Sequence, residues 1–429
     1  MSSTGENSRL PSSHYSKSLS YFLSSLNGFS KQKVRIISSG SPSAGPGGLI
    51  EFTLPRGLVD LSTLTLSFVG TPSDGAFPRD IETLVDNYSV EAPGGLIANF
   101  NNNYARIFNI VADTSLPPNL NNRRAILQNG ATQATPSAAP APQTFAIKSW
   151  LGVLGSIQPH ILPTNLIGDT RVRIGLSSAN IMLAVAGANP TFTLDKIQVS
   201  VDVIKISDGV YEEMLLHHVS SGNVLELPFS GYQSWTQFNS SSWDVSQRFG
   251  FATQSLDQLW ACHYLSSEQT AGAALNGTSQ FFHRPAGKYV KDQVFSLNGT
   301  QFPSVPMAPL LSFGLLEDSL GVSQDTIHSV RENIDTPAHW LDQHVFCTSF
   351  QHVDDDSSRL ISGWNTTGAQ SNFMYISTSN GSQPPDIIVV PAAGTVPAVT
   401  APDTNTSFVF AKYTSKLCIG AGGQLYVVQ

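Results

Sequence analysis

The sequence predicts an all-β protein made of two tandem antiparallel β-sandwiches, each with one short inserted helix. Apolar and polar residues alternate with a period of two over many short segments, which is the pattern of strands with one buried face. Strands and helices do not alternate as they would in a protein with a parallel sheet. The 429 residues also exceed the length of about 250 to 300 at which a single core stops growing, so two domains are expected.

Strands of the first half are expected from residue 33 onward. In the segment 49–55, for example, Ile50, Phe52 and Leu54 alternate with Glu51 and Thr53. Stretches rich in Gly, Pro, Ser and Ala separate such segments and indicate turns. The other first-half segments with a period of two are 33–38, 63–70, 170–177 and 197–203.

Three segments break the strand pattern and are predicted to be helices. In the first half, Tyr104, Ile107, Phe108 and Val111 have helical spacing. At the midpoint, a helix is expected within 207–222, where Ser207 or Asp208 can cap its start and Gly222 can end it. In the second half, the segment 308–321 has many leucines and few β-branched residues, with Leu311, Leu315 and Leu316 at helical spacing.

The second half repeats the strand pattern after the midpoint helix. Its expected strands are short, rich in β-branched or aromatic residues, and bounded by Gly, Pro, Asn and Ser. Eight or so strands in each half indicate two sandwiches, although the two halves share no visible sequence similarity. The expected second-half strands are 223–229, 256–265, 344–350, 372–378, 385–390, 406–413, 416–420 and 424–428.

The composition favours association with other protein surfaces. Charged residues make up only 13% of the chain, about half of the usual quarter, so there is little repulsion to keep copies apart. A polar secreted protein could have the same composition, but the N-terminus lacks the apolar stretch of a secretory signal. No apolar run is long enough to span a membrane. We therefore expect a protein that is made inside the cell and is not secreted by a signal peptide.

The N-terminal region is expected to be a basic arm. Residues 1–30 are rich in Ser and predict a flexible segment, interrupted by one amphipathic helix with Leu19, Phe22, Leu23 and Leu26 on one face. That helix could dock under its own domain, or it could contact a neighbouring subunit or a membrane. The net charge is −8 for the whole chain but +4 for residues 1–35, where Glu6 is the single acid. The basic residues of this region are Arg9, Lys17, Lys31, Lys33 and Arg35.

No pattern in the sequence predicts catalysis or a cofactor. The phosphate-binding loop, the nucleophile elbow and paired C-x-x-C motifs are missing. Asp342 and His344 would share a face of a strand near His339 and Cys347, but a third metal ligand is not evident, so a loop entering a half-buried strand is the preferred interpretation. The acidic segment 352–356 is interpreted as a solvated loop. His217 and His218 are adjacent on the midpoint helix and so face different ways.

The three cysteines, Cys262, Cys347 and Cys418, are odd in number and lie only in the second half. They do not suggest a disulfide framework, and we expect them to be small buried hydrophobic residues.

The order of these segments resembles the double jelly-roll major capsid proteins of Polinton-like viruses, virophages and related small eukaryotic DNA viruses. In the first half the resemblance lies in segments 47–68, 86–113 and 149–177, followed by the strand and helix of 195–222. In the second half it lies in segments 294–316, 359–378 and 408–428. The resemblance covers residues 30–429 by the order and character of its segments, and it includes no catalytic signature.

This resemblance implies a specific fold. The chain would form two eight-stranded antiparallel jelly rolls, with residues 1–30 as the arm, 31–206 as the first roll, 207–222 as the connector helix and 223–429 as the second roll. Three chains would associate into a homotrimer that forms a pseudo-hexagonal, hexon-like capsomer.

The resemblance also implies a function. The capsomers would tile the icosahedral capsid of a DNA virus, and the protein would be a structural protein of the virion with no enzymatic activity. Its partners would be neighbouring capsomers, penton and other minor capsid proteins, and, through an inward-facing arm, the genome or an internal membrane. The alternative is a carbohydrate-binding or adhesive β-sandwich protein, which would be a secreted monomer with exposed aromatic residues.

Overall fold

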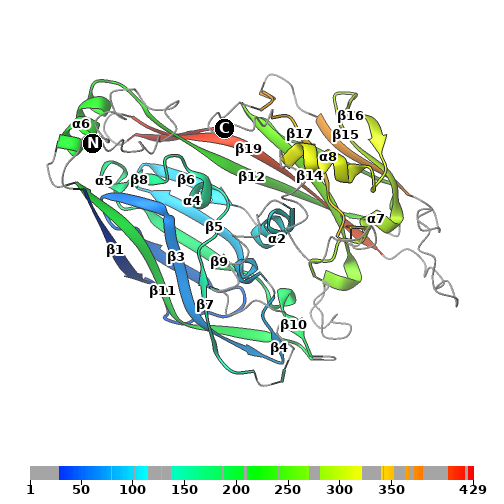
Figure 1. Ribbon diagram of the computed structural model, residues 1–429, viewed down its shortest axis with the longest axis horizontal. Helices are drawn as coiled ribbons and strands as arrows, with labels where there is room; N and C mark the ends of the chain where they lie inside the picture. Colours follow the sequence, from blue (N-terminus) through cyan, green and yellow to red (C-terminus); the bar gives the residue numbers. More distant parts are fainter. Residues whose placement is uncertain are drawn as a thin grey trace, which may run out of the picture.

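The strands of the chain divide into two sets, β1 to β11 and β12 to β20, joined by one helix (Figure 1). All strand pairs within the sheets are antiparallel. The computed structural model describes residues 29–78, 80–100, 103–114, 127, 137–138, 140–185, 188–206, 210–239, 242–269, 281–320, 340–341, 343–351, 363–367, 372–379, 404–420 and 424–429.

The first set of strands forms two principal sheets. One has the order β1 (Phe29–Ile37), β11 (Thr191–Ile206), β3 (Leu58–Ser73) and β7 (Gln143–Ile147), with β8 (Ile161–Pro163) also paired to β3. The other has the order β2 (Leu49–Thr53), β9 (Arg171–Leu176), β5 (Val85–Ala92) and β6 (Gly95–Phe100). A two-stranded sheet of β10 (Leu183–Ala184) and β4 (Gly75–Ala76) lies beside them.

The second set repeats this arrangement. One sheet has the order β12 (Leu225–Asn239), β19 (Asn405–Ile419), β14 (Leu256–Leu265) and β17 (Phe346–Ser349), and β20 (Leu425–Val428) also pairs with β19. The other has the order β13 (Val245–Gly250), β18 (Asn372–Ser379), β15 (Val290–Leu297) and β16 (Thr300–Met307).

The two sets have the same topology. When the eight main strands of each set are counted along the chain, one sheet has the order 1-8-3-6 and the other 2-7-4-5, in both sets. This is the strand order of a jelly roll, in which two Greek keys wrap into a double sheet. The longest inserted helix also falls between the fifth and sixth strands each time, as α2 (Tyr104–Thr114) and α8 (Ser312–Leu320). The expected all-β fold of two tandem jelly rolls with short inserted helices is confirmed.

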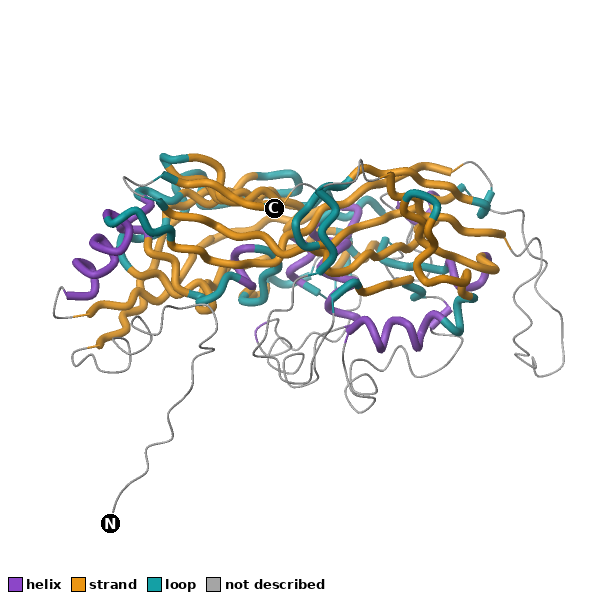
Figure 2. The backbone as a smooth tube through the Cα atoms, turned by 90° about the horizontal axis from the view of Figure 1, so that it is seen from above, coloured by secondary structure: helices purple, strands orange, loops and turns teal. Residues whose placement is uncertain are grey.

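The remaining helices are short, apart from the connector. Helix α6 (Val210–Ser220) lies between β11 and β12 at one end of the elongated molecule, within the segment where a midpoint helix was expected (Figure 2). Of the helices in the described residues, none is long and apolar enough to cross a membrane. The other helices are η1 (Ile81–Leu84), α4 (Val153–Ser156), α5 (Thr164–Ile167), η2 (Ala179–Ile181), η3 (Ser266–Gln269) and α7 (Ala286–Tyr289).

Strand β14 shows how the two rolls share one hydrophobic core. Leu259 and Ala261 face the other sheet of the second roll, whereas Trp260, Cys262 and Tyr264 belong to the same apolar cluster as the core of the first roll. Nine of its ten residues are therefore buried, although an antiparallel sheet commonly leaves one face in water. The sheet that contains β14 is thus covered on both faces, and the two rolls form one continuous body.

Candidate functional site

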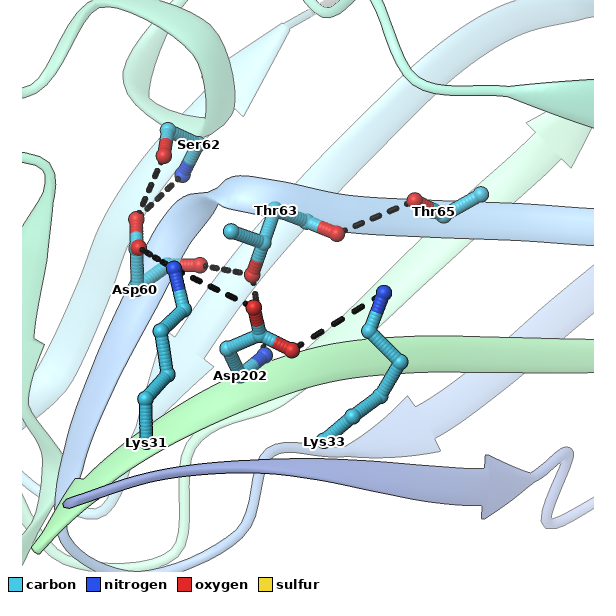
Figure 3. Close-up of polar contacts among 7 residues, drawn as sticks. All are labelled: Lys31, Lys33, Asp60, Ser62, Thr63, Thr65 and Asp202. Carbon is cyan, nitrogen blue, oxygen red and sulfur yellow. Dashed lines mark hydrogen bonds and ion pairs between the residues drawn. The ribbon is translucent and has the colours of Figure 1, made fainter.

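Strand β1 carries three of the basic residues that the sequence singles out, and two of them contact a pair of carboxylates. Asp60 on β3 and Asp202 on β11 lie directly opposite each other, an arrangement that is destabilising for like charges. The Lys31 Nζ atom lies 2.9 Å from Asp60 Oδ2 and 3.1 Å from Asp202 Oδ2, so it bridges the two carboxylates (Figure 3). The Lys33 Nζ atom lies 3.9 Å from Asp202 Oδ1. These ion pairs attach the outermost strand β1 to β11 and to β3, the next strand of the sheet.

A bulge in β3 places Asp60 in this cluster. The pairing with β11 changes register between Ser200 and Asp202, so residues 61–64 of β3 lie opposite a single residue of β11. The amide of Ser62 donates to Asp60 Oδ1, and the Thr63 hydroxyl donates to the Asp60 carbonyl and accepts from the Asp202 amide (Figure 3). Burial raises the pKa of Asp60, but hydrogen bonds from Ser62 and Lys31 outweigh it, and the net shift is downward. The hydrogen bond to Asp60 raises the pKa of Lys31.

Of the five basic residues expected in the arm, three lie on strand β1 and two lie outside the described residues. Lys31, Lys33 and Arg35 are exposed and alternate along β1, where they share one face. Arg9 and Lys17 lie outside the described residues, and so does the expected amphipathic helix with Leu19 to Leu26. An inward-facing role of these residues stays a prediction.

A buried arginine joins the two rolls. Arg284 has no exposed surface, and its guanidinium donates to Asn109 Oδ1 at 2.7 Å and to Asp113 Oδ2 at 3.1 Å. Both acceptors are on α2 of the first roll, four residues apart and therefore on one helix face. The carbonyls of Phe282 and Gln343 accept the remaining hydrogen bonds at 3.4 Å. Burial lowers the pKa of Arg284, but interactions with Asp113, Tyr264 and Cys262 together outweigh burial, and the net shift is upward.

Aromatic contacts surround this ion pair. The Arg106 guanidinium of α2 lies 4.7 Å from the centre of the Tyr264 ring and 5.0 Å from that of Phe281, both of which belong to the second roll. Phe100 of β6 stacks on Tyr232 of β12 with 5.5 Å between ring centres. Such aromatic and cation–π contacts favour a fixed packing of the two rolls.

Backbone hydrogen bonds also cross the junction, at the edge of β12. The Ser230 amide donates to Ser156 Oγ at 2.8 Å, and the Gln158 amide donates to the Pro228 carbonyl at 2.9 Å. Strand β12 is the outermost strand of its sheet, so these bonds satisfy polar groups on its otherwise unpaired side. The turn that contains Ser156 and forms these hydrogen bonds requires Gly155, because a Cβ atom there would lie 1.8 Å from the Trp150 carbonyl oxygen.

Comparison with known proteins gives matches at the level of structure. No protein-family model and no curated protein matches the sequence. PBCV-1 VP54, fitted into a cryo-EM reconstruction of the virophage Sputnik, matches 94% of this chain and 97% of its own length, with a TM-score of 0.63 and 13% identity. The Faustovirus major capsid protein matches 90% of each chain, with a TM-score of 0.55 and 8% identity.

A third match is the 3.5 Å cryo-EM structure of the Sputnik virophage itself. It covers 94% of this chain and 89% of its own chain, with a TM-score of 0.52 and 10% identity. This chain has the fold of these three structures. Because the likeness to PBCV-1 VP54 covers 94% of this chain and 97% of the other, it includes both jelly rolls.

The two candidate metal clusters of the sequence lie partly outside the described residues. His344 is buried, with Nε2 lying 3.0 Å from Gln293 Nε2 and 3.0 Å from Ser312 Oγ. His339, Asp342 and residues 352–356 lie outside the described residues. Within the residues that the structure describes, no group of three or more His, Cys, Asp or Glu side chains could hold a metal ion. His217 is exposed on α6, and its neighbour His218 is half-buried.

The cysteines are buried and unpaired, as expected from the sequence. Burial raises the pKa of Cys262 to about 11 and also raises those of Cys347 and Cys418. A thiol with a raised pKa is protonated at neutral pH and is a poor nucleophile. These three residues act as small apolar side chains in the core.

Sequence reasoning missed the residues that join the rolls. Arg284 belongs to no local motif, and its partners Asn109 and Asp113 are more than 170 positions away. One signal was present. A lone arginine after two phenylalanines, in a chain with few charges, is a candidate for a buried ion pair, because a charge in apolar surroundings needs a partner.

Proposed function

We propose that this protein is a major capsid protein that forms homotrimeric, pseudo-hexagonal capsomers of an icosahedral virus shell enclosing the genome. The observation that carries the proposal is the repeat of one jelly-roll topology in two joined sandwiches, together with the likeness to capsid proteins over 94% of the chain. Three chains around a threefold axis would present six similar rolls, and a six-cornered block can tile a flat facet. This function requires a rigid subunit and no catalysis.

The junction between the rolls supports this proposal. A subunit that tiles a shell must keep its two rolls in a fixed relation, because a hinge would alter the outline of the capsomer. The buried Arg284 ion pair, the stacked Phe100 and Tyr232 rings and the shared apolar cluster all oppose such a hinge. Subunits held in this way would give capsomers of uniform shape.

The division of the chain is part of the same proposal. Residues 1–30 would form the arm, 31–206 the first roll, 207–222 the connector and 223–429 the second roll. The arm would point inward and meet the genome or an internal membrane. The ion pairs of Lys31 and Lys33 with Asp60 and Asp202 leave Arg9 and Lys17 as the arm's own charges for such partners. Neighbouring capsomers, penton and minor capsid proteins would contact the outer flanks.

The mass of the purified protein in solution tests the proposal. Three chains of 46.0 kDa give 138 kDa, and we expect this mass from light scattering or sedimentation at micromolar protein concentration. Obligate interfaces of this kind bury about 2,000 Å² or more, so the trimer should persist on dilution. A stable monomer at high concentration would contradict the capsomer and would favour the adhesive or carbohydrate-binding sandwich.

Removing residues 1–28 tests the role of the arm. The described part of the chain begins at Phe29, so the truncated protein keeps every described strand and should still form a trimer. We expect shell assembly, followed by electron microscopy of particles, to be impaired. The arm's contribution to genome binding should be salt-sensitive, because each phosphate contact adds little. Loss of the trimer on truncation would show that the arm acts in trimer formation instead.

A further inference from the structure

The first strands of the two rolls are equivalent, but the described residues cover the free edge of only one of them. Strands β1 and β12 each begin a roll, each pair with the last strand of that roll, and each form the outermost strand of their sheet. The free edge of β12 accepts and donates hydrogen bonds through Pro228 and Ser230 to residues 156–158 of the first roll. Within the described residues, β1 has β11 as its single strand partner. The described part of the chain therefore covers one of two equivalent edges.

The uncovered edge has the features of a docking surface. Lys31, Lys33, Arg35 and Ile37 share one face of β1, and Ile37 is 73% exposed, the highest value among the large apolar side chains described. Of its three cations, Lys31 and Lys33 form ion pairs with Asp60 and Asp202, which leaves Arg35 beside Ile37 for a partner. Long edge strands with exposed apolar residues invite pairing with another chain, unless a partner covers them.

The covering surface of the first roll has a counterpart in the second. In the first roll, β6 and the start of α2 meet β12 through the ring stack of Phe100 and the side-chain hydrogen bond of Asn103 to Ser234. The counterparts of β6 and α2, by strand order, are β16 and α8. We name residues 300–320, which contain both, the β16–α8 flank.

The β16–α8 flank is apolar and acidic. Val305 is 64% exposed, and Leu310 and Leu311, just before α8, are also exposed. Glu317 and Asp318 are the only charged residues between 300 and 320. The flank thus offers apolar surface and negative charge, which complement Ile37 and Arg35 of β1.

The two surfaces lie on opposite flanks of the molecule. Figure 1 shows β1 on the side of the first roll that faces away from the second roll, and β16 on the side of the second roll that faces away from the first. Surfaces that differ and lie on opposite sides produce head-to-tail contacts, which close into a ring when the rotation between subunits allows it.

We propose that the β16–α8 flank of one subunit docks on strand β1 of the next, so that the contact between subunits repeats the contact between the two rolls of one chain. This inference rests on the proposed trimer and specifies its interface. Three such contacts close the ring, and every first strand in the trimer is then covered, β12 from within its own chain and β1 by a neighbour.

Two single substitutions test the contact from its two sides. Ile37→Asp places a charge on β1 opposite the acidic flank, and Leu311→Asp places one in the apolar part of the flank. Both side chains are mostly exposed in the single chain, so the fold should tolerate them. Each variant should lose the 138 kDa species and sediment at 46 kDa under conditions in which the unaltered protein is a trimer. Phe238→Asp is the matched control, because Phe238 is 65% exposed but lies outside both surfaces.

Mixing the two variants gives the decisive measurement. The Ile37→Asp subunit keeps an intact flank and the Leu311→Asp subunit keeps an intact β1, so one good contact can form between them. We expect a 1:1 heterodimer of 92 kDa, two chains of 46.0 kDa, that does not close into a trimer. Formation of this heterodimer also shows that both variants are folded.

The outcomes separate the inference from the function on which it rests. If the unaltered protein is a monomer, the capsomer itself is contradicted. If it is a trimer but both variants remain trimers, the trimer stands and the proposed contact is wrong. If both variants are monomers and the mixture stays at 46 kDa, a head-to-tail contact between these two surfaces is excluded.

Discussion

Replacing Arg284 with Met is expected to lower the free energy of unfolding by about 3 to 5 kcal/mol, the usual cost of removing one partner of a buried ion pair. The substitution leaves Asp113 without its cation and Asn109 Oδ1 without its 2.7 Å hydrogen bond, both in a buried position. Urea unfolding at a fixed protein concentration measures the loss. The concentration must be constant, because association adds to the apparent stability.

Two further variants make this result specific. Arg248→Met removes an exposed arginine from β13 and should change the free energy of unfolding by no more than about 0.5 kcal/mol. Combining Arg284→Met with Asp113→Asn also removes the carboxylate charge that Arg284 neutralises. The double variant should therefore lose less free energy of unfolding than the two single variants lose in sum. A loss below about 1 kcal/mol for Arg284→Met, or strict additivity, would contradict a coupled ion pair at this junction.

Periodicity predicts individual strands well where one face of the strand is exposed to solvent. In β2 and β9, buried residues such as Phe52 and Val172 alternate with exposed or half-exposed ones, and both segments were predicted. The inserted helix α2 was predicted from the helical spacing of its apolar residues, although nine of its eleven residues are buried and it has no exposed face. Local sequence contains the signal for β2 and β9 because each of these strands faces both core and solvent.

Pairing order and long strands are harder to predict. The segments 406–413 and 416–420 were expected as separate strands, but they are parts of the single strand β19. The polar residues Thr414 and Ser415 break the pattern, yet Thr414 Oγ1 donates to the buried Asp257 carboxylate and Ser415 is buried. The acceptor of the Thr414 hydroxyl lies far away in the sequence, and the Ser415 hydroxyl has no hydrogen-bond partner in the described residues, so local pattern reports the burial of neither side chain. The order of the strands came from the resemblance and not from periodicity.

The junction between the rolls was not predictable for the same reason. Its ion pair joins α2 to a segment more than 170 residues away, and neither partner has a local motif. Strand β14 was predicted, but its burial on both faces follows from the first roll packing against it. A single sequence contains little information about contacts of this kind, because they depend on which elements the fold brings together.

Acid is expected to destabilise the second roll through two buried histidines. Burial lowers the pKa of His263 to about 4 and that of His344 to about 3, with neighbouring cationic groups adding to the shift for His344. The unfolded chain binds protons at these side chains below a pH of about 6.5, whereas the folded chain does not until near pH 4 and pH 3. Their contribution is therefore complete above pH 6.5 and is lost as the pH falls toward these values.

The surroundings of both rings explain why they stay neutral. The ring nitrogens of His263 lie 3.2 Å from Asn405 Oδ1 and 3.1 Å from the Tyr375 hydroxyl, so no carboxylate is bonded to this ring. His344 Nε2 lies 3.0 Å from the amide nitrogen of Gln293, which donates to it. Protonation would place an N–H group against that amide, in a site where Arg284 also disfavours positive charge.

Unfolding measurements between pH 7 and pH 5 isolate this effect, because ordinary carboxylates do not titrate in that window. Each histidine should reduce the free energy of unfolding by about 2 kcal/mol at pH 5, since one pKa unit corresponds to about 1.4 kcal/mol. His344→Gln keeps a hydrogen-bonding side chain but cannot titrate. Its free energy of unfolding should therefore fall by about 2 kcal/mol less between pH 7 and pH 5 than that of the unaltered protein. His217→Gln, on the exposed surface of α6, should leave the pH dependence unchanged. Equal pH dependence in all three proteins would mean that His344 is protonated in the folded chain, which its apolar surroundings and the amide of Gln293 oppose.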